Sequence, residues 1–302
     1  MAATASLIVS VYNQPRELEL VLLRLLQQTA RDFEVVVADD GSTPETAELV
    51  ADWRRRAPFP VQHCWQEHRG YRLPVILNKA SLAARGDYLI FLNGDCLPHR
   101  RYVESHLRFA RPDAVLNGRR GVMVEPALGR RLSPRLVGSR HFDAWPRLLW
   151  WWLRRELRGV ERAVRFESRL LRRLVPDHEN LIGADFSLHR RAMFEANGFD
   201  ETMADLGGSD RELGHRLQLL GLRLVNTRNL TVTYHLEHPR HPARPHPQGE
   251  LKRLLAENRV PVCRHGLREL RFGSEIGTAL KRWLAAERNR GATTRSDGRL
   301  EN

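Results

Sequence analysis

The sequence contains few cysteines and no long apolar run. Its three cysteines, Cys64, Cys96 and Cys263, lie far apart and form no C-x-x-C pair, which argues against a disulfide framework and against a structural zinc site. No stretch reaches the roughly 18 apolar residues that a membrane-spanning helix needs. The apolar segment from Leu7 to Tyr12 is too short for a signal peptide, and no basic region precedes it. These absences predict a protein of the reducing cytoplasm that is soluble or peripheral on a membrane.

Two glycine-rich nucleotide-binding motifs are also missing. The first apolar segment is followed by Tyr12-Asn13-Gln14-Pro15 and not by G-x-G-x-x-G, and no G-x-x-x-x-G-K-[ST] motif occurs anywhere in the chain. Dinucleotide-dependent and P-loop chemistry are therefore poorly supported. The same four residues argue against a nucleotidyltransferase that makes nucleotide sugars, because such an enzyme needs a glycine-rich, basic loop at this position.

The chain does contain enough apolar residues for a core, together with an excess of positive charge. Hydrophobic residues make up 42% of its 302 residues, which is sufficient for one large α/β domain or two small ones. The formal net charge is +13, and most of the positive charge is arginine. This charge permits a polyanionic partner, namely nucleic acid, an anionic membrane surface or a phosphorylated substrate. Charge alone does not choose among them.

Short apolar segments alternate with segments of helical periodicity over the first 100 residues. Strands and helices that alternate at this spacing form right-handed βαβ units. We therefore predict an α/β fold with a single, mostly parallel sheet flanked by helices. The expected strands are Leu7–Val11, Phe33–Ala38, Pro60–Trp65 and Tyr88–Leu92, and the expected helices span residues 15–28, 43–56 and 74–84.

The turn after the fourth strand carries a chemical signal. Asn93-Gly94-Asp95 follows directly on Tyr88–Leu92, so Asp95 is expected at the carboxyl edge of the sheet, where α/β proteins bind ligands. A carboxylate held by a turn suits a hard divalent cation, and such a cation suits a diphosphate. The alternative is a polar turn without a ligand, because these residue types are common in turns.

Five motifs, in order along the chain, resemble those of family 2 glycosyltransferases. They are Ser10-Val11-Tyr12-Asn13, the segment from Gln27 to Ser42, the segment from Ala83 to Asp95, the segment from Asn197 to Leu217, and Tyr234-His235. Asn93-Gly94-Asp95 is similar to the family's D-x-D metal motif, and Gly207-Gly208-Ser209-Asp210 is similar to its G-G-E-D acceptor motif. The resemblance covers roughly residues 5 to 240 and implies a GT-A fold.

The resemblance also implies an activity. It implies an inverting glycosyltransferase that moves a hexosyl or N-acetylhexosaminyl group from a nucleotide sugar, with UDP expected, to a glycan or lipid-linked acceptor. Such relatives commonly make surface polysaccharide or lipopolysaccharide. The implied catalytic base is Asp210, with Glu212 as a competitor, and the implied metal ligands are Asp95 and His235. Manganese suits one oxygen and one nitrogen ligand better than magnesium does.

The remaining implied contacts form two groups. The nucleotide-sugar site comprises Ser10, Tyr12, Asn13, Asp40, Arg72, Asn78, Asn93 and Gly94, and the acceptor site comprises Asp185, Gly208 and Ser209. Plainer interpretations exist for three of the key residues: Asp210 as a helix-terminal charge, Asp40 as a turn residue and Arg72 as a solvated arginine. Asn93 and Ser209 replace acidic residues of the two family motifs. These losses leave open a binding protein with a decayed transferase domain.

A basic segment interrupts the alternating pattern. Residues 147–173 contain nine arginines, three glutamates and the consecutive tryptophans Trp150, Trp151 and Trp152. At 100° per residue, apolar positions from Leu149 to Leu171 share one arc and the arginines lie opposite. This predicts a basic amphipathic helix, or a pair of them, that binds an anionic membrane surface on the inner face of the cytoplasmic membrane, and no specific nucleic acid. The alternative is a helix that packs on its own domain while its arginines are only solvated.

The pattern divides the chain into four segments. Residues 1–125 form the expected nucleotide-sugar half of the domain, 126–180 the basic helical insertion, and 181–245 the acceptor half. Residues 246–302 are expected to form helices with a polar tail, and the proline- and histidine-rich stretch from residue 238 to 247 is expected to be a loop, because its prolines prevent a helical H-x-x-x-H metal site.

Overall fold

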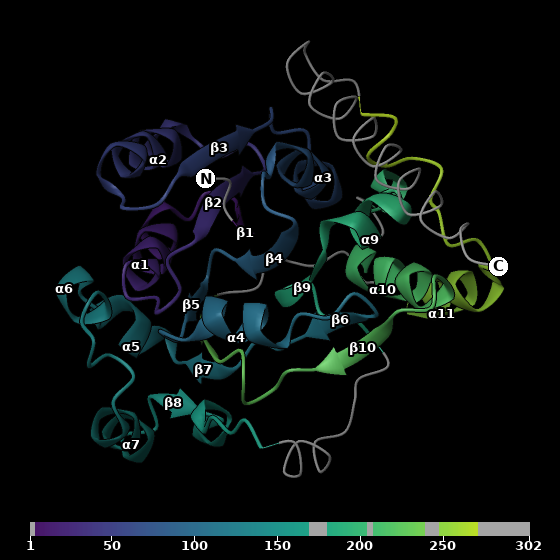
Figure 1. Ribbon diagram of the computed structural model, residues 1–302. Helices are drawn as coiled ribbons and strands as arrows, with labels where there is room; N and C mark the ends of the chain where they lie inside the picture. Colours follow the sequence, from purple (N-terminus) through teal and green to yellow (C-terminus); the bar gives the residue numbers. More distant parts are fainter. Residues whose placement is uncertain (1–3, 169–179, 204–207, 239–247, 271–302) are drawn as a thin grey trace, which may run out of the picture.

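The computed structural model describes residues 4–168, 180–203, 208–238 and 248–270, which form two sheets surrounded by helices (Figure 1). The larger sheet has seven strands in the order β10-β6-β9-β4-β1-β2-β3, and the smaller has four in the order β5-β11-β7-β8. The strands of the larger sheet are β1 (Ala5–Val11), β2 (Phe33–Asp39), β3 (Val61–Trp65), β4 (Tyr88–Asn93), β6 (Ala114–Asn117), β9 (Asp185–His189) and β10 (Arg223–Asn226).

The larger sheet is mixed but mostly parallel. Strands β3, β2, β1 and β4 run parallel to one another, and β10 is parallel to β6. Strand β9 is antiparallel to both of its neighbours, β4 and β6. All the strands and helices predicted within the first 100 residues are present, at bounds that differ by a few residues.

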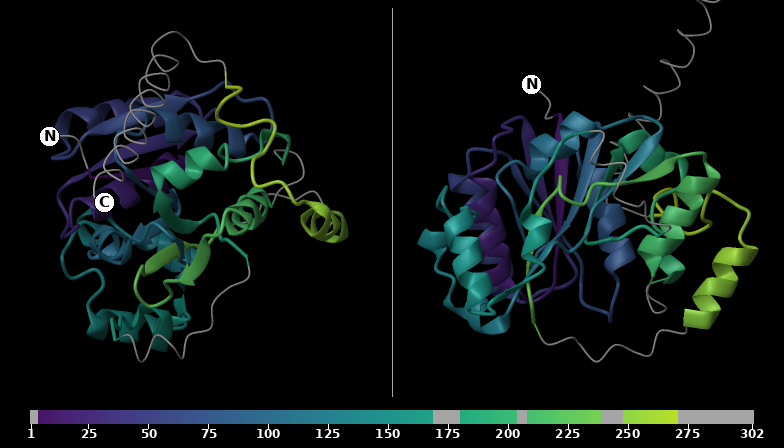
Figure 2. Two further views of the ribbon diagram at one scale, coloured as in Figure 1. Left: turned by 45° about the vertical axis from the view of Figure 1, so that its right-hand side comes forward. Right: turned by 90° about the horizontal axis from the view of Figure 1, so that it is seen from below.

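Helices cover both faces of the larger sheet (Figure 2). Leu7 and Val9 of β1 belong to one apolar core, with α1 (Pro15–Leu25) and α2 (Pro44–Arg56). Ile8 belongs to a second core on the other face, with α3 (Leu73–Ala83), α9 (Arg190–Glu195) and α10 (Ser209–Leu219). Because side chains alternate along a strand, a strand buried on both faces is an unbroken apolar run. This is why the sequence of β1 contains so few polar residues.

The smaller sheet corrects the prediction of a single sheet. It contains β5 (Cys96–Pro98), β7 (Val122–Val124), β8 (Leu157–Arg158) and β11 (Thr233–Leu236). Strand β11 pairs antiparallel with β5 and parallel with β7. Since β5 follows β4 after only two residues, this pairing holds β11 beside the carboxyl end of β4. The four strands come from three of the four predicted segments, which therefore fold together.

The prediction of one continuous basic helix is wrong, whereas the alternative of a pair of helices is not tested, because residues 169–179 lie outside the described residues. The helix in this segment, α7 (Trp145–Leu153), has nine residues and ends before most of the arginines. Arg155 adopts a left-handed φ of 57°, and the chain then enters β8, which pairs with β7. Leu157 is buried in the core. Pairing with β7 and burial of Leu157 outweigh the helical periodicity, which is a local preference that tertiary contacts commonly override.

Within the described residues, most of the arginines after α7 form specific contacts and do not line one helix face. Arg154 pairs with Glu156, and Arg158 pairs with Glu125 and Glu237. The part of the predicted apolar stripe from residue 169 onward lies outside the described residues, and so does the predicted polar tail. In the described part of the chain, the other helical elements are α4 (Tyr102–Phe109), α5 (Pro126–Arg131), α6 (Pro134–Val137), η1 (Val160–Ala163), η2 (Glu201–Met203) and α11 (Gln248–Glu257).

Helix α7 nevertheless carries an exposed apolar surface. Its exposed side chains are Trp145, Leu149, Trp150, Trp152 and Leu153, with exposed fractions between 43% and 69%. We call these five residues the α7 apolar face. In Figure 1, α7 lies at the lower left, at the periphery of the fold and away from α9 and α10. No helix in the described part of the chain is long and apolar enough to cross a bilayer.

Candidate active site

Three side chains that can bind a metal converge at the carboxyl end of β4. Asp95 follows β4, His235 belongs to β11, and His238 comes two residues after β11. Oδ2 of Asp95 lies 3.2 Å from Nε2 of His235 and 3.1 Å from Nε2 of His238. The three ligand atoms lie within 4.8 Å of one another. Asp95 and His235, the predicted ligand pair, therefore lie together, and His238 joins them as a third group.

The charge state of this cluster suits a cation. Burial alone would raise the pKa of Asp95, but the adjacent imidazole of His235 and the hydrogen bond with His238 outweigh burial and hold that pKa well below its usual range. Nδ1 of His235 is buried and has no hydrogen-bond partner within the described residues. The side chain of His238 is 39% exposed, so the cluster is accessible from solvent. Two imidazole nitrogens and one carboxylate oxygen fit a divalent ion that accepts mixed ligands.

Ser10, Asn93 and Gly94 join the ends of β1 and β4 next to this cluster. Ser10 is opposite Asn93 in the parallel pair, and its Oγ donates to Oδ1 of Asn93 at 3.3 Å. The backbone N–H of Gly94 donates to the carbonyl oxygen of Ser10 at 2.8 Å. A Cβ at position 94 would lie 2.7 Å from that oxygen. Glycine is therefore required here, and the close contact fixes the turn that carries Asp95.

Asp40 and Arg72 lie where β2 ends and α3 begins. Oδ1 of Asp40 accepts from Nε2 of Gln66 at 2.6 Å, and its Oδ2 accepts from the backbone N–H of Arg72 at 2.9 Å. Burial raises the pKa of Asp40, against the opposing effect of these two hydrogen bonds. The carboxylate thus ties the loop from Gln66 to Arg72 to the end of β2. Each of its oxygens keeps a second lone pair for a ligand.

An aromatic pair stands after β1. The ring of Tyr12 stacks on that of His68 with centroids 4.8 Å apart and an angle of 18°. Asn13 has a left-handed φ of 50°. Its backbone N–H donates to Oγ of Ser42 at 2.9 Å, and its Oδ1 accepts from the backbone N–H of Thr43 at 2.9 Å. Asn13 therefore joins the turns after β1 and β2, which present Tyr12 and Asp40.

Asp210 occupies the first turn of α10. Its Oδ2 accepts from the backbone N–H of Gly183 at 2.9 Å, and its Oδ1 accepts from the N–H of Arg211 at 2.9 Å. The side chain is half-buried. Partial burial and the charges of Asp210 and Asp40 raise the pKa of Tyr71 to about 12. Tyr71 therefore lies within electrostatic range of both carboxylates, which belong to the two predicted halves of the site.

Glu212, the competitor for the role of base, is already engaged. Both of its carboxylate oxygens accept from Arg216, at 2.6 and 2.7 Å. The Arg216 side chain is only 1% exposed, and it also donates to the carbonyl oxygens of Ala196 and Gly198. Glu212 therefore neutralises a buried arginine that ties α10 to the turn after α9.

Two of the predicted contact residues are fully buried. Nδ2 of Asn78 donates to the carbonyl oxygen of Phe199 and to Glu201, and its Oδ1 accepts from the N–H of Phe199. Asp185 accepts from the hydroxyls of Tyr102 at 2.8 Å and Thr231 at 3.0 Å. Both side chains have zero exposure. They connect elements behind the site, and we do not retain either as a direct contact of the donor or acceptor.

Gly208 and Ser209 form the start of α10. Gly208 is the N-cap, with a left-handed φ of 73°, and a Cβ there would lie 2.5 Å from the side chain of Leu251. Glycine is therefore favoured both by conformation and by space. Ser209 is the first residue of the helix and is buried. This geometry orients the first turn of α10 and with it Asp210.

Comparison with known proteins decides the family. Residues 6–195 match the model of Glycosyl transferase family 2. The chain belongs to this family. Among its curated relatives is the chondroitin synthase of Escherichia coli, which is 24% identical over 78% of this chain and 35% of the relative. The validoxylamine A glucosyltransferase of Streptomyces hygroscopicus subsp. jinggangensis (strain 5008) is 30% identical over 74% of this chain and 53% of the relative.

Solved structures share the fold at low identity. S. aureus TarS, residues 1–349, in complex with UDP-GlcNAc is similar with a TM-score of 0.55 and 17% identity, over 84% of this chain and 65% of that one. GalNAc-T7 with UDP, GalNAc and Mn2+ is similar with a TM-score of 0.56 and 15% identity, over 78% of this chain and 44% of that one. The predicted family and the GT-A type of fold are confirmed. The chain spans about a third to a half of the length of the two curated relatives named above.

Several residues of the site were outside the prediction. His238 opens the proline- and histidine-rich stretch that predicts a loop, and no helical spacing links it to His235. His68 and Tyr71 lie in an irregular loop, where no periodicity marks a side chain as functional. The signal that could have identified His238 is its position three residues after His235. At that spacing, the chain leaving the end of the strand can fold back so that the two imidazoles lie side by side.

Proposed function

We propose that this chain is an inverting glycosyltransferase that moves a sugar from a nucleotide sugar to a glycan or glycolipid acceptor. The observation that supports it most is the convergence of Asp95, His235 and His238 at the edge of the sheet, in a member of family 2. A divalent ion held by these three residues supplies the positive charge that neutralises a departing diphosphate. Two imidazole nitrogens in the ligand set favour manganese over magnesium, which prefers oxygen ligands.

The donor site is assigned to the turns after β1, β2 and β4. Tyr12 offers an aromatic face, and Asp40 offers acceptor lone pairs that suit an N–H of a nucleobase. Arg72 supplies positive charge, while Ser10, Asn13, Asn93 and Gly94 shape the turns. The similarity to TarS with UDP-GlcNAc and to GalNAc-T7 with UDP motivates UDP as the nucleotide and a hexose or N-acetylhexosamine as the sugar.

Asp210 is assigned as the base that takes the proton from the attacking acceptor hydroxyl. It is half-buried, it is held by two backbone N–H groups, and its oxygens retain lone pairs for that proton. The pairing of Glu212 with Arg216 argues against Glu212 in this role. One base with no nucleophile assigned beside it corresponds to a single displacement with inversion. Gly208 and Ser209 orient this base toward the acceptor.

The proposal is tested by a thermal-shift screen of nucleotide sugars. With a UDP-sugar at about a hundred times its Kd, and Mn2+ present, stabilisation is about 2.7 kcal/mol, which raises Tm by about 5–10 °C for a domain of this size. We expect no such shift without the metal and a smaller one with Mg2+. Donor hydrolysis that depends on Mn2+ separates an enzyme from a binding protein with a decayed site. If no nucleotide sugar gives either signal, the transferase proposal is abandoned.

The role of His238 gives a second prediction. Replacing it by alanine removes one nitrogen ligand but no buried packing, since the side chain is partly exposed. We expect the affinity for Mn2+ to fall at least as much as the roughly 10–100-fold that loss of a supporting group costs a metal site. Isothermal titration with Mn2+ measures this directly. Replacing the exposed His265 by alanine is the control, and equal affinities in both variants contradict the assignment of His238.

A location at a membrane is the second part of the proposal. The α7 apolar face presents three exposed tryptophans, and the guanidinium of Arg154 lies over the ring of one of them, Trp150. Tryptophan beside arginine is typical of interfacial helices on anionic lipid. We propose that the protein is peripheral on the inner face of the cytoplasmic membrane, where a lipid-linked acceptor for surface polysaccharide or lipopolysaccharide is available. The structural feature that supports a membrane location is thus the exposed face of the short helix α7, and not a long helix lined by arginines.

A further inference from the structure

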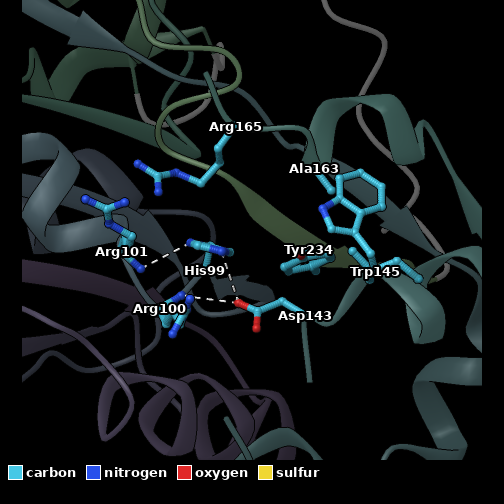
Figure 3. A pocket seen from close by; sticks show the side chains of 9 residues that line it. His99, Arg100, Arg101, Asp143, Trp145, Ala163, Arg165 and Tyr234 are labelled. Atoms are coloured by element: carbon cyan, nitrogen blue, oxygen red, sulfur yellow. Dashed lines mark hydrogen bonds and ion pairs between the residues drawn. The ribbon is translucent and has the colours of Figure 1, made fainter. Parts of the chain in front are cut away.

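A cavity next to α7 has one cationic wall and one apolar wall (Figure 3). Its volume is about 200 Å³. Arg100, Arg101 and Arg165 supply the positive charge, and Trp145, Leu148 and Tyr234 supply the apolar side. The volume is below the roughly 300–1,000 Å³ of pockets for drug-sized ligands. The cavity is therefore too small for a nucleotide sugar and has room for a small anionic group that carries some apolar surface.

The cavity is separate from the metal cluster, although the same strand lines both. Tyr234 lines the cavity, and the next residue of β11, His235, lies against Asp95. Because successive side chains of a strand point to opposite faces, the cavity lies on the face of β11 opposite the metal cluster. A ligand in the cavity does not compete with the donor for His235.

The negative charge at the cavity is compensated by neighbouring groups. Asp143 pairs with Arg24 at 2.9 Å. Burial lowers the pKa of His99 to about 4, so this imidazole is neutral at pH 7. Nδ1 of His99 accepts from the backbone N–H of Arg101 at 3.1 Å, which places its proton on Nε2, 3.3 Å from Asp143. Arg24 and His99 together therefore satisfy Asp143.

The positive charge is not fully compensated. Arg101 pairs with Glu104 at 2.7 Å and with Glu167 at 3.6 Å, and Arg165 pairs with Glu167 at 3.2 Å. The guanidinium of Arg100 is exposed and makes no hydrogen bond or ion pair within the described residues. The carboxylates of Glu104 and Glu167 thus pair with Arg101 and Arg165, whereas the positive charge of Arg100 has no counter-charge within the described residues. An anion at the cavity mouth would pair with it.

Trp145 connects the cavity to the α7 apolar face. It lines the cavity and is 43% exposed at the start of α7. We propose that the cavity binds the phosphate of an anionic phospholipid headgroup in a bilayer on which the α7 apolar face lies. The inference rests on the proposed location at a membrane. Cationic and apolar walls side by side match a phosphate joined to a glycerol and its acyl chains, and the unpaired charge of Arg100 complements an anionic headgroup.

The first experiment compares vesicle binding of two variants with equal loss of charge. Arg100→Gln removes the cavity charge, and Arg54→Gln removes an exposed arginine of α2, on a different part of the surface. On vesicles of phosphatidylcholine with phosphatidylglycerol, we expect Arg100→Gln to weaken sedimentation about tenfold, as loss of a charged hydrogen bond does, and Arg54→Gln to weaken it less than about twofold, since distant charges are screened. Neither variant is expected to sediment with vesicles of pure phosphatidylcholine. Equal binding by the two variants overturns the cavity proposal.

The second experiment separates the cavity from the α7 apolar face and from free phosphate. Calorimetric titration uses dibutyryl phosphatidylglycerol, a lipid that dissolves as a monomer, and inorganic phosphate. We expect the soluble lipid to bind the parent protein and the Trp150→Ala/Trp152→Ala variant equally, and to bind Arg100→Gln about tenfold more weakly. Inorganic phosphate that binds as tightly as the lipid would identify a site for free anions and overturn the proposal.

Failures of the two linked proposals have different signatures. Vesicle binding that needs Trp150 and Trp152 but is unaffected by Arg100→Gln leaves the membrane location standing and overturns the cavity proposal. No vesicle binding by the parent protein overturns both. Unfolding temperatures of all variants within a few degrees of the parent show that lost binding is not lost folding. Donor hydrolysis, measured in parallel without vesicles, reports on the transferase proposal alone.

Discussion

Replacing Asp95 by asparagine is expected to abolish metal-stimulated donor hydrolysis while the fold persists. Asp95 is the carboxylate that both histidines of the cluster face, so the neutral amide removes the charge that attracts the cation. Loss of a Lewis acid that supplies several kcal/mol corresponds to a rate reduced by about a hundredfold or more. Asparagine has nearly the same shape, so the hydrogen bond with His238 can persist. Initial rates of sugar release, with and without Mn2+, measure the effect.

The control residue directly precedes β4, and the residue of a converse change is the last of that strand. Asp87 is exposed at the opposite end of β4, so Asp87→Asn removes the same charge without touching the cluster and is expected to leave hydrolysis unchanged. Asn93→Asp restores the carboxylate that the family motif carries, and we expect it to tighten Mn2+ binding. Hydrolysis by Asp95→Asn at the parent's rate, or a parent rate that ignores Mn2+, contradicts the assignment of the metal site.

The sheet and its edge could be predicted because their signals are local. β1, β2 and β4 are buried on both faces, so their sequences are unbroken apolar runs ended by polar turns. The turn at Gly94 leaves room only for glycine, and Asp95 follows it. The apolar run that indicates burial on both faces and the glycine that indicates the turn are both visible within a few consecutive residues. The sequence therefore predicted both the strand and the position of its carboxylate.

What could not be predicted depends on long-range pairing. The periodicity from Leu149 to Leu171 favours a helix, yet β8 pairs with β7 from a segment more than 30 residues earlier. Asn78 lies in a region that resembles the family's donor half, yet its amide bonds to Phe199, 121 residues away. His238 reaches Asp95 because β11 pairs with β5. In each case the deciding contact joins residues that no local pattern relates.

Glu212 and Asp210 illustrate how structure separates two carboxylates that the sequence leaves in competition. They lie two positions apart in the first turn of α10, so they point to different faces of the helix. Glu212 faces inward and pairs with the buried Arg216, whereas the half-buried Asp210 accepts from the backbone N–H of Gly183. A carboxylate committed to a buried cation is poorly placed to accept a proton, because protonation would leave that cation uncompensated.

Replacing Asp210 by asparagine is therefore expected to retain donor binding and lose transfer. The amide oxygen can still accept one of the two backbone N–H bonds that position the side chain, but an amide does not take a proton from the acceptor hydroxyl. We expect kcat to fall by roughly 10²–10⁴-fold, the range typical of a lost general base, with the Mn2+-dependent thermal shift by the donor unchanged.

Glu212→Gln is the matched control, since it makes the same chemical change two residues away. It leaves the buried charge of Arg216 without its counter-charge and is expected to lower the free energy of unfolding by about 3–5 kcal/mol, while the folded enzyme keeps a kcat within a few-fold of the parent. The two variants therefore differ in which measurement changes. Asp210→Asn is expected to lower kcat without a change in stability, and Glu212→Gln is expected to lower stability with nearly the same kcat. The reverse pattern would falsify the assignment of Asp210 and move the base to Glu212, because a buried ion pair predicts a loss of stability and a base predicts a loss of rate.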